Sequence, residues 1–161
     1  MSRGGRTIKK RVANLDPVYN SKLVTKLINK SMKDGKKSVA RTQVYRALEL
    51  LKEKFAGEEP GKLLEQALNA VAPKMEVRSR RVGGASYQVP SEVRGERRMH
   101  LALKWVIEGA RTRSNKEFHT FAEKLAAEVS DVLSNTGNAI KKRDQVQKMA
   151  EANRAFAHLR W

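Results

Sequence analysis

The segment from Lys74 to Arg98 constrains the fold of this chain more than any other, because it alternates like a β-hairpin in a chain that otherwise has helical spacing. Two alternating runs flank Gly83-Gly84, and the segment carries seven Lys or Arg residues. A two-stranded hairpin is only marginally stable in isolation, so it needs a partner surface. We therefore expect a helical body from which one basic hairpin protrudes towards a polyanionic partner.

Helical periodicity covers most of the remaining chain, since apolar residues recur there every three or four positions. Gly, Pro and Asn residues punctuate these stretches where helices begin and end. The predicted helices run from Ser21 to a stop at Asp34-Gly35, over about 37–55, from Pro60 to a stop at Pro73, over about 92–110, from a cap at Asn115 through Val129, and over about 138–158.

The fold class that follows is mainly α: a bundle of about six helices with one protruding two-stranded β-hairpin and a basic N-terminal arm. The length of 161 residues fits one domain with room for a core. We expect the arm over 1–16 and a single helical domain over 17–161, with the hairpin at about 74–90. Pro90 is expected to end the second strand, because proline interrupts strand pairing.

The hairpin is expected to have two different faces. Met75 and Val77 should pack on the helical body, while Glu76 and Arg78 point the other way. Two interpretations of Tyr87 stay open: it stacks on a base or sugar, as aromatic residues do in RNA recognition, or it packs across its own strand pair.

The charge of the chain indicates what its partner is. Lys and Arg number 34 against 17 acidic residues, a net charge of +17, and such an excess destabilises a compact chain by self-repulsion. A nucleic acid is the commonest partner that relieves it. An anionic membrane is the main rival, but the chain has neither an apolar span nor the amphipathic helix with a Trp/Phe/Leu face that membrane docking requires. We expect a nucleic acid, no membrane and a cytoplasmic location.

The first sixteen residues have too few apolar groups to fold alone. A disordered tail is one interpretation, and the sign of the charge favours the other, an arm that becomes ordered on a phosphate backbone. Its basic residues are Arg3, Arg6, Lys9, Lys10 and Arg11.

Nothing in the sequence indicates catalysis. There is no cysteine, and His100, His119 and His158 lie too far apart for a metal-ligand motif. The acidic residues, Glu123 and Glu128 among them, lie mainly between basic residues and are interpreted as solvated helix charge. We expect no enzyme, no metal, no cofactor and no small-molecule substrate.

Three blocks of sequence are similar to one known family. They are Gly35-Lys36-Lys37-Ser38, the run from Arg80 to Pro90, and the ending from Met149 to Trp161. In this order they resemble the bacterial small-subunit ribosomal protein S-seven family, and the match extends from Asp16 to the last residue. The resemblance implies a structural protein that binds the 3′ major domain of small-subunit (16S) ribosomal RNA, nucleates assembly of the subunit head and lies near the exit-site transfer RNA. A general nucleic-acid or DNA binder and a nuclease are the alternatives.

Charge and resemblance together give the expected binding residues. Besides the arm, the residues expected to bind ribosomal RNA are Lys33, Lys36, Lys37, Lys74, Arg78, Arg94, Arg97, Arg98, Arg111, Arg113, Lys141, Lys142 and Arg143. The resemblance implies that the hairpin tip reaches the exit-site transfer RNA or messenger RNA side, through Arg80, Arg81, Val82, Gly83, Gly84, Ser86 and Tyr87.

The resemblance also implies protein partners, the neighbouring small-subunit proteins nine and eleven. The last basic helix would face the eleventh. The residues expected to contact a partner protein are Lys148, Met149, Asn153, Phe156 and Trp161.

Overall fold

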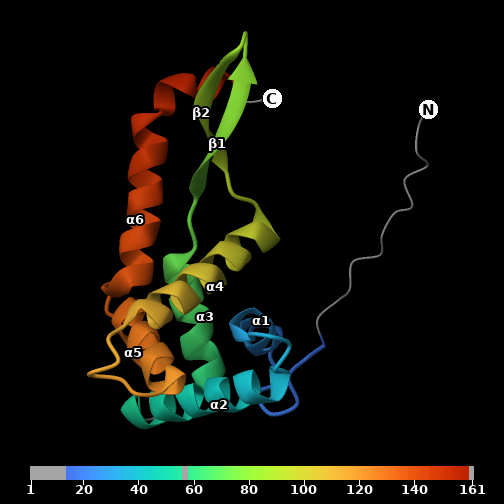
Figure 1. Cartoon of the computed structure of the whole chain (residues 1–161), viewed down its shortest axis with the longest axis vertical. Coiled ribbons are helices and arrows are strands. Elements are labelled where there is room, and N and C mark those ends of the chain that lie inside the picture. Colours follow the sequence, from blue (N-terminus) through green and yellow to red (C-terminus); the bar gives the residue numbers. More distant parts are fainter. Residues whose placement is uncertain (1–13, 56–57, 160–161) are drawn as a thin grey trace, which may run out of the picture.

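The computed structural model describes residues 14–55 and 58–159, and these form a mainly helical fold with one hairpin (Figure 1). This confirms the predicted fold class. In chain order the elements are α1 (Lys22–Ser31), α2 (Lys37–Lys54), α3 (Pro60–Val71), β1 (Met75–Val82), β2 (Ala85–Glu92), α4 (Gly95–Thr112), α5 (Phe121–Leu133), α6 (Gly137–Ala152) and the 3-10 helix η1 (Arg154–Leu159).

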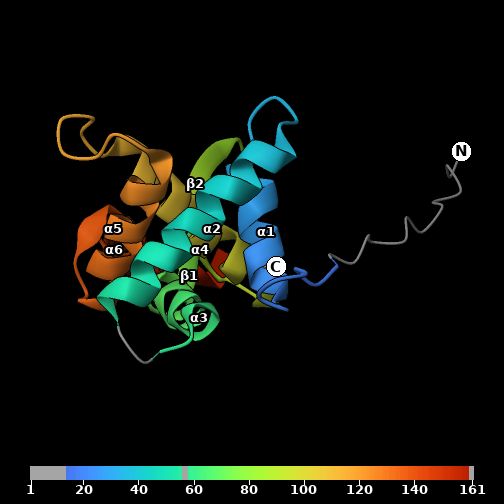
Figure 2. The ribbon, with the colours of Figure 1, turned by 90° about the horizontal axis from the view of Figure 1, so that it is seen from below.

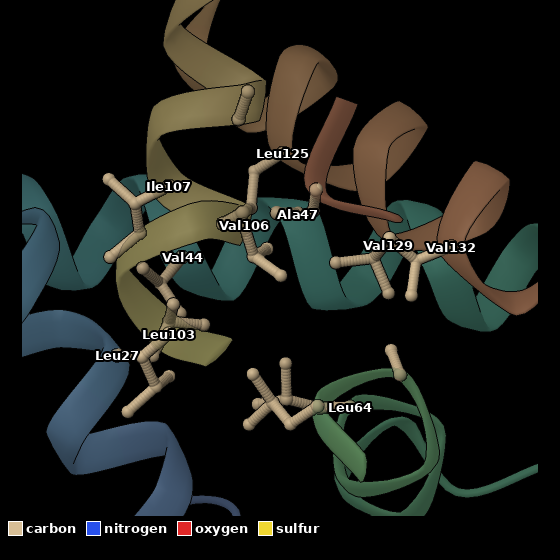
Figure 3. Packing of buried hydrophobic residues seen from close by; sticks show 14 of the residues in the cluster. Leu27, Val44, Ala47, Leu64, Leu103, Val106, Ile107, Leu125, Val129 and Val132 are labelled. Carbon is tan, nitrogen blue, oxygen red and sulfur yellow. The ribbon is translucent and has the colours of Figure 1, made fainter. Parts of the chain in front are cut away.

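The core lies among the helices and is built from the apolar stripes that the sequence spacing predicted. Leu27, Val44, Leu64, Val106 and Leu125, one from each of α1 to α5, are at most 1% exposed and converge on one cluster (Figure 3). Helix α2 crosses the end of this body that lies opposite the hairpin, as the view from below shows (Figure 2). The helices thereby form a rigid base from which the hairpin projects.

The hairpin is antiparallel, with Met75 opposite Glu92 and Val82 opposite Ala85. The prediction that Pro90 ends the second strand is wrong, because β2 continues to Glu92 and α4 begins only at Gly95. A two-stranded ribbon has two edge strands, and proline is tolerated on an edge strand because its missing N–H can face away from the partner.

The start of α5 also differs from the prediction, since Asn115 does not begin a helix. Thr120 is the cap instead: its hydroxyl accepts a hydrogen bond from the N–H of Glu123 at 3.2 Å, and its own N–H donates to the Glu123 carboxylate at 3.2 Å. This reciprocal pair satisfies two N–H groups that the helix leaves open. Asn115 instead accepts a hydrogen bond from the Lys124 ammonium, and Phe118 lies outside the helix.

The last predicted helix is divided into two elements. Helix α6 ends at Ala152, and the side-chain amide of Asn153 donates to the carbonyl of Met149 at 2.7 Å. The chain then turns into η1, which packs on β2, while α6 runs along the hairpin (Figure 1). The C-terminal part of the described chain therefore supports the hairpin.

Within residues 14–55 and 58–159, no helix combines the length and the apolar character that crossing a membrane requires.

Candidate nucleic-acid interface

The hairpin tip projects away from the helical body (Figure 1). Gly83 and Gly84 form the turn with φ values of 58° and 90°, a left-handed conformation that glycine adopts without strain. Arg81 and Ser86 are exposed, and Arg80 and Val82 are half-buried. The tip thus presents cationic side chains and accessible backbone to whatever lies beyond it.

Tyr87 packs against η1. Its ring centroid lies 5.3 Å from that of Phe156, with the ring planes inclined at 50°. Both side chains are half-buried. This contact of Tyr87 is neither stacking on a base or sugar nor packing across its own strand pair. Phe156, which was expected to contact a partner protein, has a partner within the chain. The pair attaches the hairpin to η1.

The base of the hairpin contains a buried acid, which corrects the predicted faces. Met75 and Val77 are only half-buried, while Glu76, expected on the outer face, is 6% exposed. The guanidinium of Arg97 donates through Nε to Glu76 Oε1 at 2.9 Å and to Oε2 at 2.8 Å, and Arg78 Nε donates to Oε1 at 2.6 Å. Burial alone would raise the pKa of Glu76, but the hydrogen bonds and charges of the two arginines bring it below its ordinary value.

A basic hollow lies where the hairpin meets the start of α4. It has a volume of about 360 Å³. Its lining residues are Arg78, Arg80, Val89, Ser91, Glu92, Arg94 and Arg97. Four of the lining residues are arginines. Arg78, Arg94 and Arg97 were predicted to bind ribosomal RNA, and Arg80 was predicted to face the exit-site transfer RNA.

A second basic hollow, of about 650 Å³, lies between α1 and α4. Lys26, Lys30, Arg97 and His100 are among its lining residues, so Arg97 borders both hollows. Burial lowers the pKa of His100, and the charges of Lys30, Arg97 and Lys104 lower it further. The sequence prediction missed Lys26 and Lys30, because nothing in the spacing of α1 shows that they face α4.

The turn between α1 and α2 carries a third group of cations. Lys33, Lys36 and Lys37 are exposed, and Arg111 of α4 reaches the same place by donating to the carbonyl of Ser31 at 3.1 Å. These side chains lie at the surface, where a nucleic acid could reach them.

Arg113, which was predicted to bind RNA, points inward. Its side chain is 14% exposed and binds Glu128 Oε2 through Nη2 at 2.7 Å, with a further bond to Asp131. Glu128 is 0% exposed and also accepts a hydrogen bond from the N–H of Ala139 at 2.9 Å. The interpretation of Glu128 as solvated charge is therefore wrong, because a buried network holds it.

Helix α6 has an exposed basic face. Lys141, Lys142, Lys148 and Met149 are exposed on it, whereas Arg143 is half-buried and donates to the carbonyl of Ala70 at 2.8 Å. This face is open to a partner.

The remaining predicted residues are placed as follows. Lys74 and Arg94 are exposed, and Arg98 is half-buried with a buried Nε that has no partner in the described chain. The predicted residues Arg3, Arg6, Lys9, Lys10, Arg11 and Trp161 lie outside the described residues.

These features define a class of protein. Within residues 14–55 and 58–159, no cluster of His, Asp and Glu could hold a metal ion. Cations spread over two adjoining hollows, a turn and a projecting hairpin suit a long polyanion better than one small anion. The fold and the surface are those of a structural nucleic-acid-binding protein.

The chain belongs to the ribosomal protein S7p/S5e family, whose sequence model matches residues 2–154. It is 56% identical to the small ribosomal subunit protein uS7 of Caldicellulosiruptor bescii over 154 residues, which are 96% of each chain. The proteins of that name from Thermoanaerobacter sp. strain X514 and Carboxydothermus hydrogenoformans are 54% and 53% identical, again over 96% of each chain. The family confirms the resemblance seen in the three sequence blocks. The chain is a structural constituent of the small ribosomal subunit and not an enzyme.

Proposed function

We propose that this protein binds the 3′ major domain of 16S ribosomal RNA through its two hollows and the α1–α2 turn, and nucleates assembly of the subunit head. The observation that carries the proposal is the continuity of the two basic hollows at Arg97, which offers a phosphate backbone one track from α1 to the hairpin. We infer a cytoplasmic location, where bacterial ribosomes work.

The hairpin tip and α6 have separate proposed partners. The tip projects furthest from the body and is the candidate contact for exit-site transfer RNA. The exposed face of α6, with Lys148 and Met149, is the candidate contact for the small-subunit protein eleven, and the ninth is a further expected neighbour. Met149 is 44% exposed, so its apolar side chain is accessible to such a partner.

Selective binding tests the main proposal. We expect the protein to bind a transcript of the 3′ major domain at least about tenfold more tightly than an unrelated structured RNA of equal length at the same salt concentration, a difference of about 1.4 kcal/mol. Filter binding over a range of protein concentrations measures both affinities. Duplex DNA of equal charge is the control for purely electrostatic binding, and equal affinity for all three nucleic acids would overturn the proposal.

Changing the hairpin tip tests the second part. In subunits reconstituted with the Arg80→Ala/Arg81→Ala variant, we expect weaker retention of transfer RNA at the exit site. For binding of the protein to RNA, each phosphate contact that the variant loses should lower the slope of log affinity against log salt concentration by about one. The matched control is Lys62→Ala, which removes a cation paired with Glu59 on α3. Unchanged transfer RNA retention in the double variant would rule out this role for the tip.

A further inference from the structure

Glu76 is an acid buried within the most basic part of the molecule. It is 6% exposed, and the side chains of Arg78 and Arg97 that bind it are 48% and 53% exposed. Both arginines use Nε and Nη2 for the carboxylate. Because a guanidinium has five N–H donors, each arginine keeps donors for a second acceptor on its solvent side.

The Glu76 carboxylate is the shared partner of the two guanidinium groups. Without it the two like charges would repel each other, and each free arginine side chain would populate many rotamers. The negative charge of the Glu76 carboxylate compensates one of the two positive charges, and the carboxylate fixes both side chains through hydrogen bonds shorter than 3.0 Å. The arginine from the hairpin and the arginine from α4 are thereby fixed before any ligand arrives.

Both arginines border the hollow of about 360 Å³ between the hairpin and α4. Ser91 lines the same hollow, and its hydroxyl oxygen is buried and makes no hydrogen bond within the described chain. Buried polar groups are nearly always satisfied, so this hydroxyl is available to a ligand that enters the hollow. A backbone phosphate suits the site, since its oxygens accept bidentate hydrogen bonds from arginine and a further one from a hydroxyl.

We propose that Glu76 is a positioning residue, which holds Arg78 and Arg97 as one fork around a single backbone phosphate of the bound RNA. This inference rests on the proposed RNA-binding function and adds a specific geometry to it. It means that an acidic residue strengthens the binding of a polyanion. General electrostatics predicts the opposite, because removing an acid increases the positive charge of the protein.

The Glu76→Gln variant distinguishes the two. We expect it to bind the 3′ major domain transcript about tenfold more weakly at fixed salt, the factor that about one charge-assisted hydrogen bond contributes. The slope of log affinity against log salt should fall by about one. The matched control is Glu59→Gln, which removes the same charge from an exposed pair with Lys62 and should bind as the wild type does or slightly more tightly. Equal or tighter binding by Glu76→Gln would overturn the inference.

A double-mutant cycle separates positioning from mere structural support. Arg97→Lys keeps the charge but loses the bidentate fork. It should weaken RNA binding when Glu76 is present and have little further effect in the Glu76→Gln background. Additive losses in affinity would contradict the inference, because independent structural damage adds.

The outcome stays decisive if Glu76→Gln does not fold, which thermal unfolding would reveal. Arg78→Lys and Arg97→Lys then carry the test in the presence of Glu76, and undiminished affinity in both overturns the inference. Failure of the proposed function is distinguishable, since in that case the wild type itself shows no preference for the 3′ major domain transcript.

Discussion

Replacing Glu128 with alanine is expected to lower the free energy of unfolding by about 3–5 kcal/mol, the range seen when one partner of a buried ion pair is removed. Glu128 is completely buried, and Arg113 binds its Oε2 through Nε at 2.9 Å and Nη2 at 2.7 Å. Without the carboxylate, Arg113 keeps only Asp131 as an acidic partner, and the N–H of Ala139 loses its acceptor. Urea denaturation followed by circular dichroism measures the loss.

The large effect follows from the position of this network. Arg113 follows the last turn of α4, Glu128 lies in α5 and Ala139 lies at the start of α6, so one carboxylate connects three helices. Glu108→Ala is the control, because Glu108 is 52% exposed and its pair with Lys104 should contribute less than about 1 kcal/mol. A loss below about 1 kcal/mol for Glu128→Ala would show that the network does not hold the helices together.

Apolar spacing is sufficient to predict most of the helical body. The stripes that include Leu27, Val44, Leu64 and Val106 point to one side of their helices, and burying those sides against each other produces the observed core. Local turn chemistry also predicted the turn at Asp34-Gly35, where both residues have left-handed φ values of 52° and 73°, but α1 itself ends earlier, at Ser31. Such features depend on neighbours within one or two turns, so the sequence alone carries them.

The buried acids could not be predicted in this way, because their environment comes from residues far away in the chain. Glu76 and Arg97 are 21 positions apart, and Glu128 and Arg113 are 15 apart. Gly109 shows the same dependence: a Cβ atom there would lie 2.6 Å from Glu128 Oε1, so the glycine makes room for a side chain of another helix. A pattern read along one helix contains none of this information.

The candidate interface was predicted in part for the same reason. The sequence indicated which residues are cations but not which of them have internal partners, and so Arg113 was grouped with exposed residues such as Lys36. Conversely, Lys26 and Lys30 attract no attention in the sequence of α1, although they line the hollow opposite α4. The contact between Tyr87 and Phe156 also depends on the turn at Asn153, which the local sequence did not predict.

Raising the salt concentration from 50 to 200 mM is expected to weaken binding to the 3′ major domain transcript by about 10³–10⁵-fold, the range for six to ten phosphate contacts. The physical reason is release of counterions: each cation that neutralises a phosphate frees an ion from the RNA, and added salt opposes that release. The adjoining hollows and the α1–α2 turn supply enough cations for this number of contacts. Their described members include Lys26, Lys30, Lys33, Lys36, Arg78, Arg94, Arg97 and Arg111.

The affinity should be measured at several salt concentrations, so that the slope of log affinity against log salt counts the contacts. Replacing Lys30 with glutamine should lower the slope by about one, whereas Lys62→Gln, which changes an exposed cation paired with Glu59, should leave it unchanged. Equal reductions in both variants would mean that net charge alone holds the RNA. A wild-type slope corresponding to only one or two contacts would show that the basic surface does not follow the RNA backbone, since a phosphate track through both hollows requires several cations to be engaged at once.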